Sequence, residues 1–134
     1  MRTITYVSTA DPSLSVETIH VLLQSAEKNN LKNQINGIFI FSEGNFFQIL
    51  EGEESIIQYL FEKIKKDPRH YDIIKLLDKE TSVHSFNNYK SSFTVIQDGT
   101  EVNKLYKFLK TEKQNNPDSF NSVSYLTQKF MSLI

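Results

Sequence analysis

Two residues, Tyr6 and Gln48, lie in segments with extended patterns, and either could take part in hydrogen-bond chemistry. Gln48 stands inside an apolar run, and leaving its amide unpaired in the interior would cost about 1 to 3 kcal/mol. A glutamine amide donates at one end and accepts at the other, so a half-turn exchanges the two. A phenol beside a redox group can give up an electron together with a proton. The pair could therefore switch hydrogen bonds beside a redox cofactor, or simply satisfy each other in a core.

Two further groups of polar residues allow both a functional and a structural interpretation. Asn29 and Asn30 end a helical pattern. Asparagine is common there because it tolerates left-handed backbone geometry, yet two adjacent amides could also bind a flat heterocycle. Asp67, Arg69 and His70 follow a second helical pattern, and they suit a helix stop with a solvated charge pair. Spacing alone leaves both interpretations open.

Composition and charge exclude several kinds of site. The 134 residues carry 15 basic and 16 acidic side chains, for a net charge of -1, without the basic stripe that indicates nucleic acid or an anionic membrane. The chain has no cysteine, which excludes disulfides and Cys-based zinc sites. Its three histidines lack the spacing of a helical metal site. We therefore predict no metal site and no nucleic-acid partner.

The sequence gives no sign of a membrane segment. No stretch approaches the roughly 20 apolar residues of a spanning helix, and residues 1–7 lack the apolar run of a signal peptide. We therefore expect a cytoplasmic protein without a membrane partner.

The chain that must position these side chains alternates strand and helix patterns. Extended patterns are predicted for residues 2–8, 38–41, 46–51, 73–77 and 92–96, and helical periodicity for residues 16–30 and 56–64. The order βαββαββ is that of the α+β ferredoxin-like fold, an antiparallel sheet with two helices on one face. Tyr6 and Gln48 would then lie on its two central strands.

The remaining residues continue with two amphipathic helical patterns, over residues 102–109 and 120–131. Their apolar faces need cover, and the open face of the sheet is the nearest candidate. We therefore predict a domain over residues 1–97, followed by a helical extension over residues 98–134 that packs on that face.

Four segments, taken in order and spacing, resemble the BLUF (blue-light using flavin) domain. They are residues 6–8, residue 30 with residues 35–37, residues 44–52, and residues 67–70. The resemblance covers about residues 1–95, and the segment from Gln48 to Gly52 is its most specific part. It implies a photoreceptor rather than an enzyme, with FAD bound non-covalently between the two helices and above the central strands.

The resemblance also implies roles for individual residues. Tyr6 is similar to the family's photochemical electron donor, and Gln48 to the amide that links this phenol to N5 and O4 of the flavin. Asn30 matches the asparagine that hydrogen-bonds the carbonyl and imide edge of the ring. In this family the glutamine rotates or tautomerises after excitation, donates a stronger hydrogen bond to O4 and shifts the spectrum reversibly to the red. Further positions lining the pocket match Ser8, Asn29, Asp67, Arg69 and His70.

The chain departs from the family pattern at three positions. Asn29 stands where the family has a histidine beside the key asparagine. Tyr89 stands where many members have a tryptophan, and Ser91 where they have a methionine. Tyr89 would either fill the volume of that side chain or help to couple Gln48 to the output surface.

Two other classes of protein deserve comparison. A ferredoxin-like enzyme such as an acylphosphatase would need an arginine in the loop after the first strand, and residues 9–13 contain none. A flavin-free ferredoxin-like module that binds a ligand or a protein stays open as the alternative. From the resemblance to short BLUF proteins, we expect a homo-oligomer that acts on a downstream partner protein through its C-terminal helices.

Overall fold

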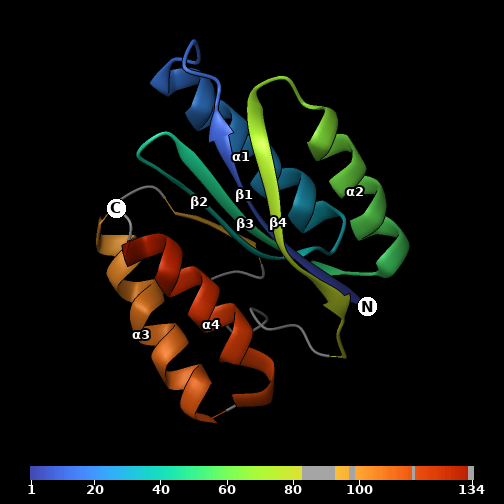
Figure 1. Cartoon of the computed structure of the whole chain (residues 1–134), viewed down its shortest axis with the longest axis vertical. Helices are drawn as coiled ribbons and strands as arrows, with labels where there is room; N and C mark the ends of the chain where they lie inside the picture. The colour runs from blue at the N-terminus through green and yellow to red at the C-terminus, as the bar shows by residue number, and fades with distance from the viewer. Residues whose placement is uncertain (83–92, 97–98, 116, 133–134) are drawn as a thin grey trace.

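A five-stranded sheet carries a pair of helices on each face (Figure 1). The computed structural model describes residues 1–82, 93–96, 99–115 and 117–132. The elements follow one another as β1 (Arg2–Ala10), α1 (Val16–Lys32), β2 (Asn36–Ser42), β3 (Asn45–Gly52), α2 (Glu54–Lys66), β4 (His70–Glu80), β5 (Phe93–Ile96), α3 (Gly99–Asn115) and α4 (Pro117–Ser132). The predicted order of elements is confirmed.

The strand order β4-β1-β3-β2-β5 confirms the ferredoxin-like arrangement, with β1 and β3 in its centre. The first four strands pair only in antiparallel fashion. The expectation of a wholly antiparallel sheet is wrong for β5, which runs parallel to β2. The reason is topological: β5 runs opposite to β4 but lies at the other edge, beside β2, and β2 also runs opposite to β4, so β5 and β2 are parallel.

Each face of the sheet has its own apolar core, because successive side chains of a strand point to opposite faces. Beneath α1 and α2, one cluster includes Ile4, Leu23, Leu50 and Ile57. On the other face, α3 and α4 pack on the sheet in a second cluster, whose described buried members are Ile38, Ile40, Phe47, Ile49, Ile96, Leu105, Leu109, Val123, Phe130 and Met131. This confirms that the C-terminal helices pack on the face of the sheet that α1 and α2 leave open.

The end of α1 lies beyond the predicted one. Asn29 and Asn30 do not cap the helix, which continues to Lys32. Asn33 follows it, and both the backbone N–H and the side-chain Nδ2 of Asn33 donate to the Asn29 carbonyl oxygen, at 3.1 and 2.8 Å. Because another asparagine ends the helix, the side chain of Asn30 is free to face the interior.

The edge strand β4 is longer than the predicted residues 73–77. It pairs with β1 over almost its whole length, from His70 opposite Ala10 to Glu80 opposite Arg2. Its outer residues are polar and exposed, so they do not show the alternation by which strands are recognised. The early start of β4 matters for function because it places His70 beside the central strands.

No helix of the described residues is both long enough and apolar enough to cross a membrane.

Gly37 allows the close approach of β2 to β3. Its φ of 143° lies in a region that other residues avoid, and a Cβ atom there would lie 1.8 Å from the carbonyl oxygen of Ile49. Gly44, in the hairpin turn, also has a positive φ of 79°, but a Cβ there would have no atom within 4 Å. The two glycines therefore share a backbone constraint, and only Gly37 adds a steric one.

We expect Gly37→Ala to destabilise the protein more than Gly44→Ala does. Positive φ alone costs a residue with a Cβ about 1 to 2 kcal/mol, and Gly37→Ala adds a collision with the backbone of β3. Urea unfolding of both variants measures the difference in the free energy of unfolding. Equal losses would show that β2 and β3 can move apart without cost.

Candidate functional site

Tyr6 and Gln48 are direct neighbours on the central strands β1 and β3. Both side chains point toward α1 and α2, and they are 2% and 3% exposed. The Gln48 Nε2 donates a hydrogen bond to the Tyr6 hydroxyl oxygen at 2.5 Å. The prediction that the two residues meet on neighbouring central strands is therefore confirmed.

The opposite end of the Gln48 amide is held much more loosely. Its Oε1 lies 3.5 Å from Nδ2 of Asn30, a distance at the limit of a hydrogen bond. Asn30 reaches this position from the last turn of α1 and is itself buried. The amide of Gln48 is thus fixed at the phenol and adjustable toward α1.

A cavity of about 250 Å³ opens beside this pair, between α1 and α2. Leu22 and Ala26 of α1 line it opposite Leu60 and Ile64 of α2, while Phe39 and Phe46 line it from the sheet. The four helix residues are only partly buried. Apolar walls with a few converging polar groups are typical of sites for organic ligands.

His70 is held in one orientation at the edge of the cavity. Its Nε2 lies 2.6 Å from the Ile64 carbonyl oxygen, and its Nδ1 lies 2.7 Å from the Ser8 hydroxyl oxygen. A carbonyl can only accept, so Nε2 carries the proton and a neutral ring accepts from Ser8 at Nδ1. The ring packs edge-on against Tyr6, with 6.2 Å between the ring centroids.

Arg69 and Asp67 form an ion pair at the mouth of the cavity. The Arg69 Nη2 donates to Asp67 Oδ2 at 2.6 Å, and Nε donates to Oδ1 at 2.9 Å. The hydrogen bonds from Arg69 hold the pKa of the Asp67 carboxyl below its usual range. Among the described contacts Nη1 of Arg69 has no hydrogen bond, so it can donate to an oxygen of a ligand.

Burial keeps the Tyr6 phenol neutral. Removal from water raises its pKa well above the ordinary value of 10.0, and the hydrogen bond from Gln48 lowers it only in part. A buried phenolate would be a poorly solvated charge, as would a buried phenol that had lost only an electron. The environment therefore favours movements of electron and proton that leave Tyr6 uncharged.

The cavity brings together seven of the eight residues predicted for the site. Ser8 is the exception, since it lies behind His70 and fixes that ring instead of lining the cavity. The seven that line the cavity are Tyr6, Asn29, Asn30, Gln48, Asp67, Arg69 and His70. Tyr89 and Ser91, which depart from the family pattern, lie outside the described residues.

Sequence reasoning did not assign the apolar walls or two helix residues, Ser25 and Lys63, to the site. The walls belong to the apolar stripes of α1 and α2, and such a stripe predicts a core without distinguishing a core from a slot. One signal in the sequence could have indicated the slot: in the predicted fold, both apolar stripes face the strands that carry Tyr6 and Gln48.

These residues fit a flavin. The flat ring system is suited to the slot between the two apolar walls, and the amides of Asn30 and Gln48 with the guanidinium of Arg69 can bind its polar edge. Among the described residues, no group of three His, Cys, Asp or Glu side chains could hold a metal ion.

Comparison with known proteins gives a consistent result. The blue light- and temperature-regulated antirepressor BluF of Escherichia coli (strain K12) is 34% identical over 77 residues, which are 58% of this chain and 19% of that protein. The photoactivated adenylate cyclase subunit beta of Euglena longa is 32% identical over 74 residues, which are 55% of this chain and 9% of that protein. The chain thus spans a small part of both relatives.

A solved structure, that of BlsA in its photo-activated state, is also similar to this chain. The TM-score is 0.67 at 29% identity, and the match covers 92% of this chain and 95% of the BlsA chain.

A family model described as sensors of blue-light using FAD matches residues 1–92, well over half of the chain. The strand order agrees with this match. The chain therefore belongs to the BLUF family, whose domains bind a flavin and sense blue light.

Proposed function

We propose that this blue-light sensor works through Tyr6 and Gln48, which respond to FAD bound between α1 and α2. The observation that carries the proposal is the unequal bonding of the Gln48 amide, short to Tyr6 and long to Asn30. A BLUF domain is a sensor module rather than an enzyme, so the product of the reaction is a changed set of hydrogen bonds.

Tyr6 is the proposed electron and proton donor. A bound flavin supplies the absorption of blue light and an excited state that accepts an electron. Because Tyr6 is buried and neutral, loss of its electron would make the phenol proton strongly acidic, and a bound flavin could accept both the electron and the proton. The only hydrogen bond described for the phenol joins it to Gln48, so Gln48 is the first group to respond.

Gln48 is the proposed switch. In the structure its N–H₂ end donates to the Tyr6 oxygen. When the proton on this oxygen leaves and returns, the amide can rotate so that its other end faces the phenol, or tautomerise so that its oxygen end carries a proton. The end facing Asn30 and the cavity then changes from acceptor to donor. Two arrangements of one buried network are the physical basis of a reversible signal.

The proposed cofactor contacts follow from the lining of the cavity. Asn30 and Gln48 would bind one polar edge of the ring, and Arg69 would donate to a carbonyl oxygen. Asn29, Asp67 and the fixed ring of His70 would complete the polar boundary. FAD rather than FMN is proposed because the matching family is described as using FAD.

The C-terminal helices are the proposed output surface toward a downstream partner protein. Phe47 precedes Gln48 in β3 but points to the other face of the sheet. There its ring stacks on the ring of Phe130 of α4, with 5.0 Å between the ring centroids. The names of the relatives associate similar domains with an antirepressor and an adenylate cyclase. Four further features of this chain stay predictions. They are its partner, its assembly into a homo-oligomer, its cytoplasmic location and the domain boundary near residue 97.

Gln48→Leu should bind flavin and lose the light response. The wild type is expected to show a flavin absorption band that shifts reversibly to the red after blue light, whereas leucine has no amide to exchange. Absorption spectra in darkness and after illumination test this, with the exposed Gln58→Leu as the control. A normal shift in Gln48→Leu would contradict the switch, and a wild type that takes up no flavin would favour the flavin-free binding module.

Tyr6→Phe should also abolish the reversible shift, because phenylalanine keeps the ring but has no proton to give. Absorption spectra in darkness and after illumination measure this as well.

The pH dependence of the free energy of unfolding tests the burial of Tyr6 separately. Above about pH 10 the unfolded tyrosine loses its proton while the buried one keeps it, so the free energy of unfolding falls as pH rises. Between about pH 10 and pH 11 the wild type should lose about 1 kcal/mol more than Tyr6→Phe. Parallel profiles from urea unfolding would mean that Tyr6 ionises normally.

Phe130→Leu should keep the red shift and reduce the signal in α4. Leucine removes the ring stack on Phe47 while leaving Tyr6 and Gln48 unchanged, so only transmission is weakened. Amide hydrogen exchange of α4 in darkness and in light measures the effect, and Val123→Ala controls for a general loosening of the helix. A light-dependent change as large as that of the wild type would exclude this contact as the route.

A further inference from the structure

A second hollow adjoins the cavity of the proposed flavin ring. Its volume is about 610 Å³, and it shares Asn29, Asn30, Leu60 and Lys63 with the first cavity. It lies between the last turn of α1 and the first turns of α2. A ligand could therefore extend from one space into the other without leaving the groove between the two helices.

The first cavity is small for a whole nucleotide cofactor. Its 250 Å³ lie below the range of about 300 to 1,000 Å³ that is usual for organic ligands. The slot suits the flat ring system, and the remainder of FAD needs another surface. The second hollow is the adjoining space of suitable size.

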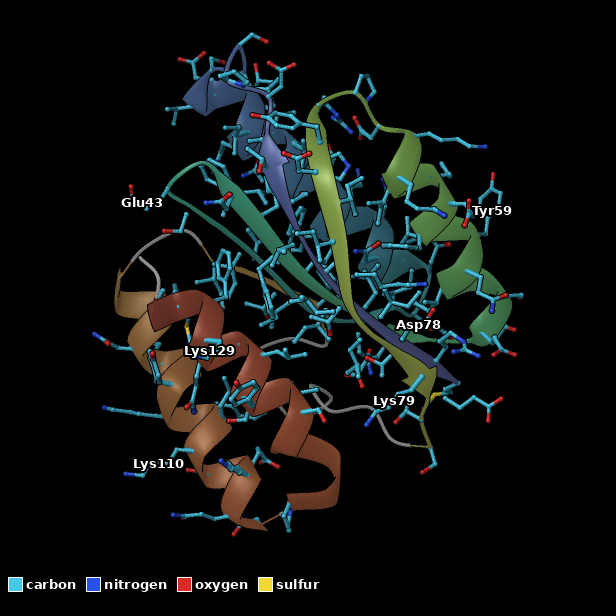
Figure 2. All side chains as sticks on the ribbon, in the orientation of Figure 1. Glu43, Tyr59, Asp78, Lys79, Lys110 and Lys129 are labelled. Carbon is cyan, nitrogen blue, oxygen red and sulfur yellow. The ribbon has the colours of Figure 1, made fainter. Side chains whose placement is uncertain are left out.

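Tyr59 lies on the wall of this hollow with its side chain largely in solvent. It is 69% exposed, and Ile56, one helical turn earlier, is 39% exposed. Figure 2 shows Tyr59 on α2 at the surface of the molecule. An exposed aromatic ring offers a face on which a base can stack, and such stacking changes affinity by roughly 5- to 150-fold.

Lys63 gives the hollow its charge. Its ammonium nitrogen lies 5.6 Å from the centroid of the Tyr59 ring, within the range of a cation–π contact. Among the described residues that line the hollow, Lys63 alone has a charged side chain, and no carboxylate faces it. The hollow therefore has a cation that can pair with phosphate groups and, beside it, an exposed aromatic ring on which a base can stack.

We propose that the second hollow binds the adenosine diphosphate half of FAD, with Tyr59 stacking on the adenine and Lys63 pairing with the phosphates. The proposal rests on the proposed function, since it requires the flavin ring in the first cavity. It makes Tyr59 the residue by which this chain prefers FAD to FMN.

Titration of the flavin-stripped full chain with riboflavin, FMN and FAD tests the role of Tyr59. The wild type should bind FAD roughly tenfold or more tightly than FMN. Tyr59→Ala should lose most of that preference while its affinity for FMN and riboflavin stays the same, and Tyr59→Phe should keep the preference. Tyr125→Ala is the matched control, because Tyr125 is 59% exposed on α4, away from the groove.

Lys63→Met tests the phosphate contact separately. The variant should weaken the binding of FMN and FAD several-fold more than that of riboflavin, which carries no phosphate, and this difference should shrink at high salt. Lys66→Met, in the same helix but outside the lining of the hollow, is the control.

The outcomes separate this inference from the proposed function. A wild type without preference for FAD, or Tyr59→Ala with the preference of the wild type, would overturn the adenine site while leaving the photoreceptor intact. A wild type that binds none of the three flavins would overturn both. Normal riboflavin binding in Tyr59→Ala, whose residue does not line the first cavity, shows that the fold and that cavity are preserved.

Discussion

The hydrogen bond between the Gln48 amide and the Tyr6 phenol is the interaction on which the arrangement of the site depends. It exists because the register of β1 and β3 places the two residues directly opposite each other on one face. A slip by one residue would turn Gln48 into the other core and bring Phe47 to the cavity. On the other side of β3, the close approach at Gly37, beside the carbonyl of Ile49, is part of the separate pairing of β2 with β3.

Burial makes this hydrogen bond suitable for switching. In water either end of the glutamine amide would find a partner at once, and its orientation would carry no information. In the interior the only described partners of the amide are Tyr6 and Asn30, so each orientation has a defined and different set of bonds. The same burial keeps the phenol uncharged, and in the proposed mechanism it would link the loss of an electron to the loss of a proton.

The sequence was most informative where a residue contradicted its surroundings. Gln48 could be singled out because an apolar strand has no other use for an amide, and the ferredoxin-like order of elements then brought Tyr6 next to it. The parallel pairing of β5 could not be predicted, because it depends on which edge of the sheet the chain reaches. Tyr59 and Lys63 could not be singled out either, since an exposed tyrosine and lysine on a helix resemble any solvated surface until the groove between the helices is known.

The alternation of side chains along β3 places the proposed switch and a residue facing the proposed output surface one peptide bond apart. Gln48 faces the cavity, and the preceding Phe47 faces α4, where it stacks on Phe130. A movement of the β3 backbone at Gln48 would also displace Phe47, so under the proposed mechanism a change of hydrogen bonds on one face would alter the packing on the opposite face. Because α3 and α4 are held to the sheet by apolar contacts rather than by strand pairing, this helix pair could shift while the register of β1 and β3 is preserved, as the proposed output surface requires.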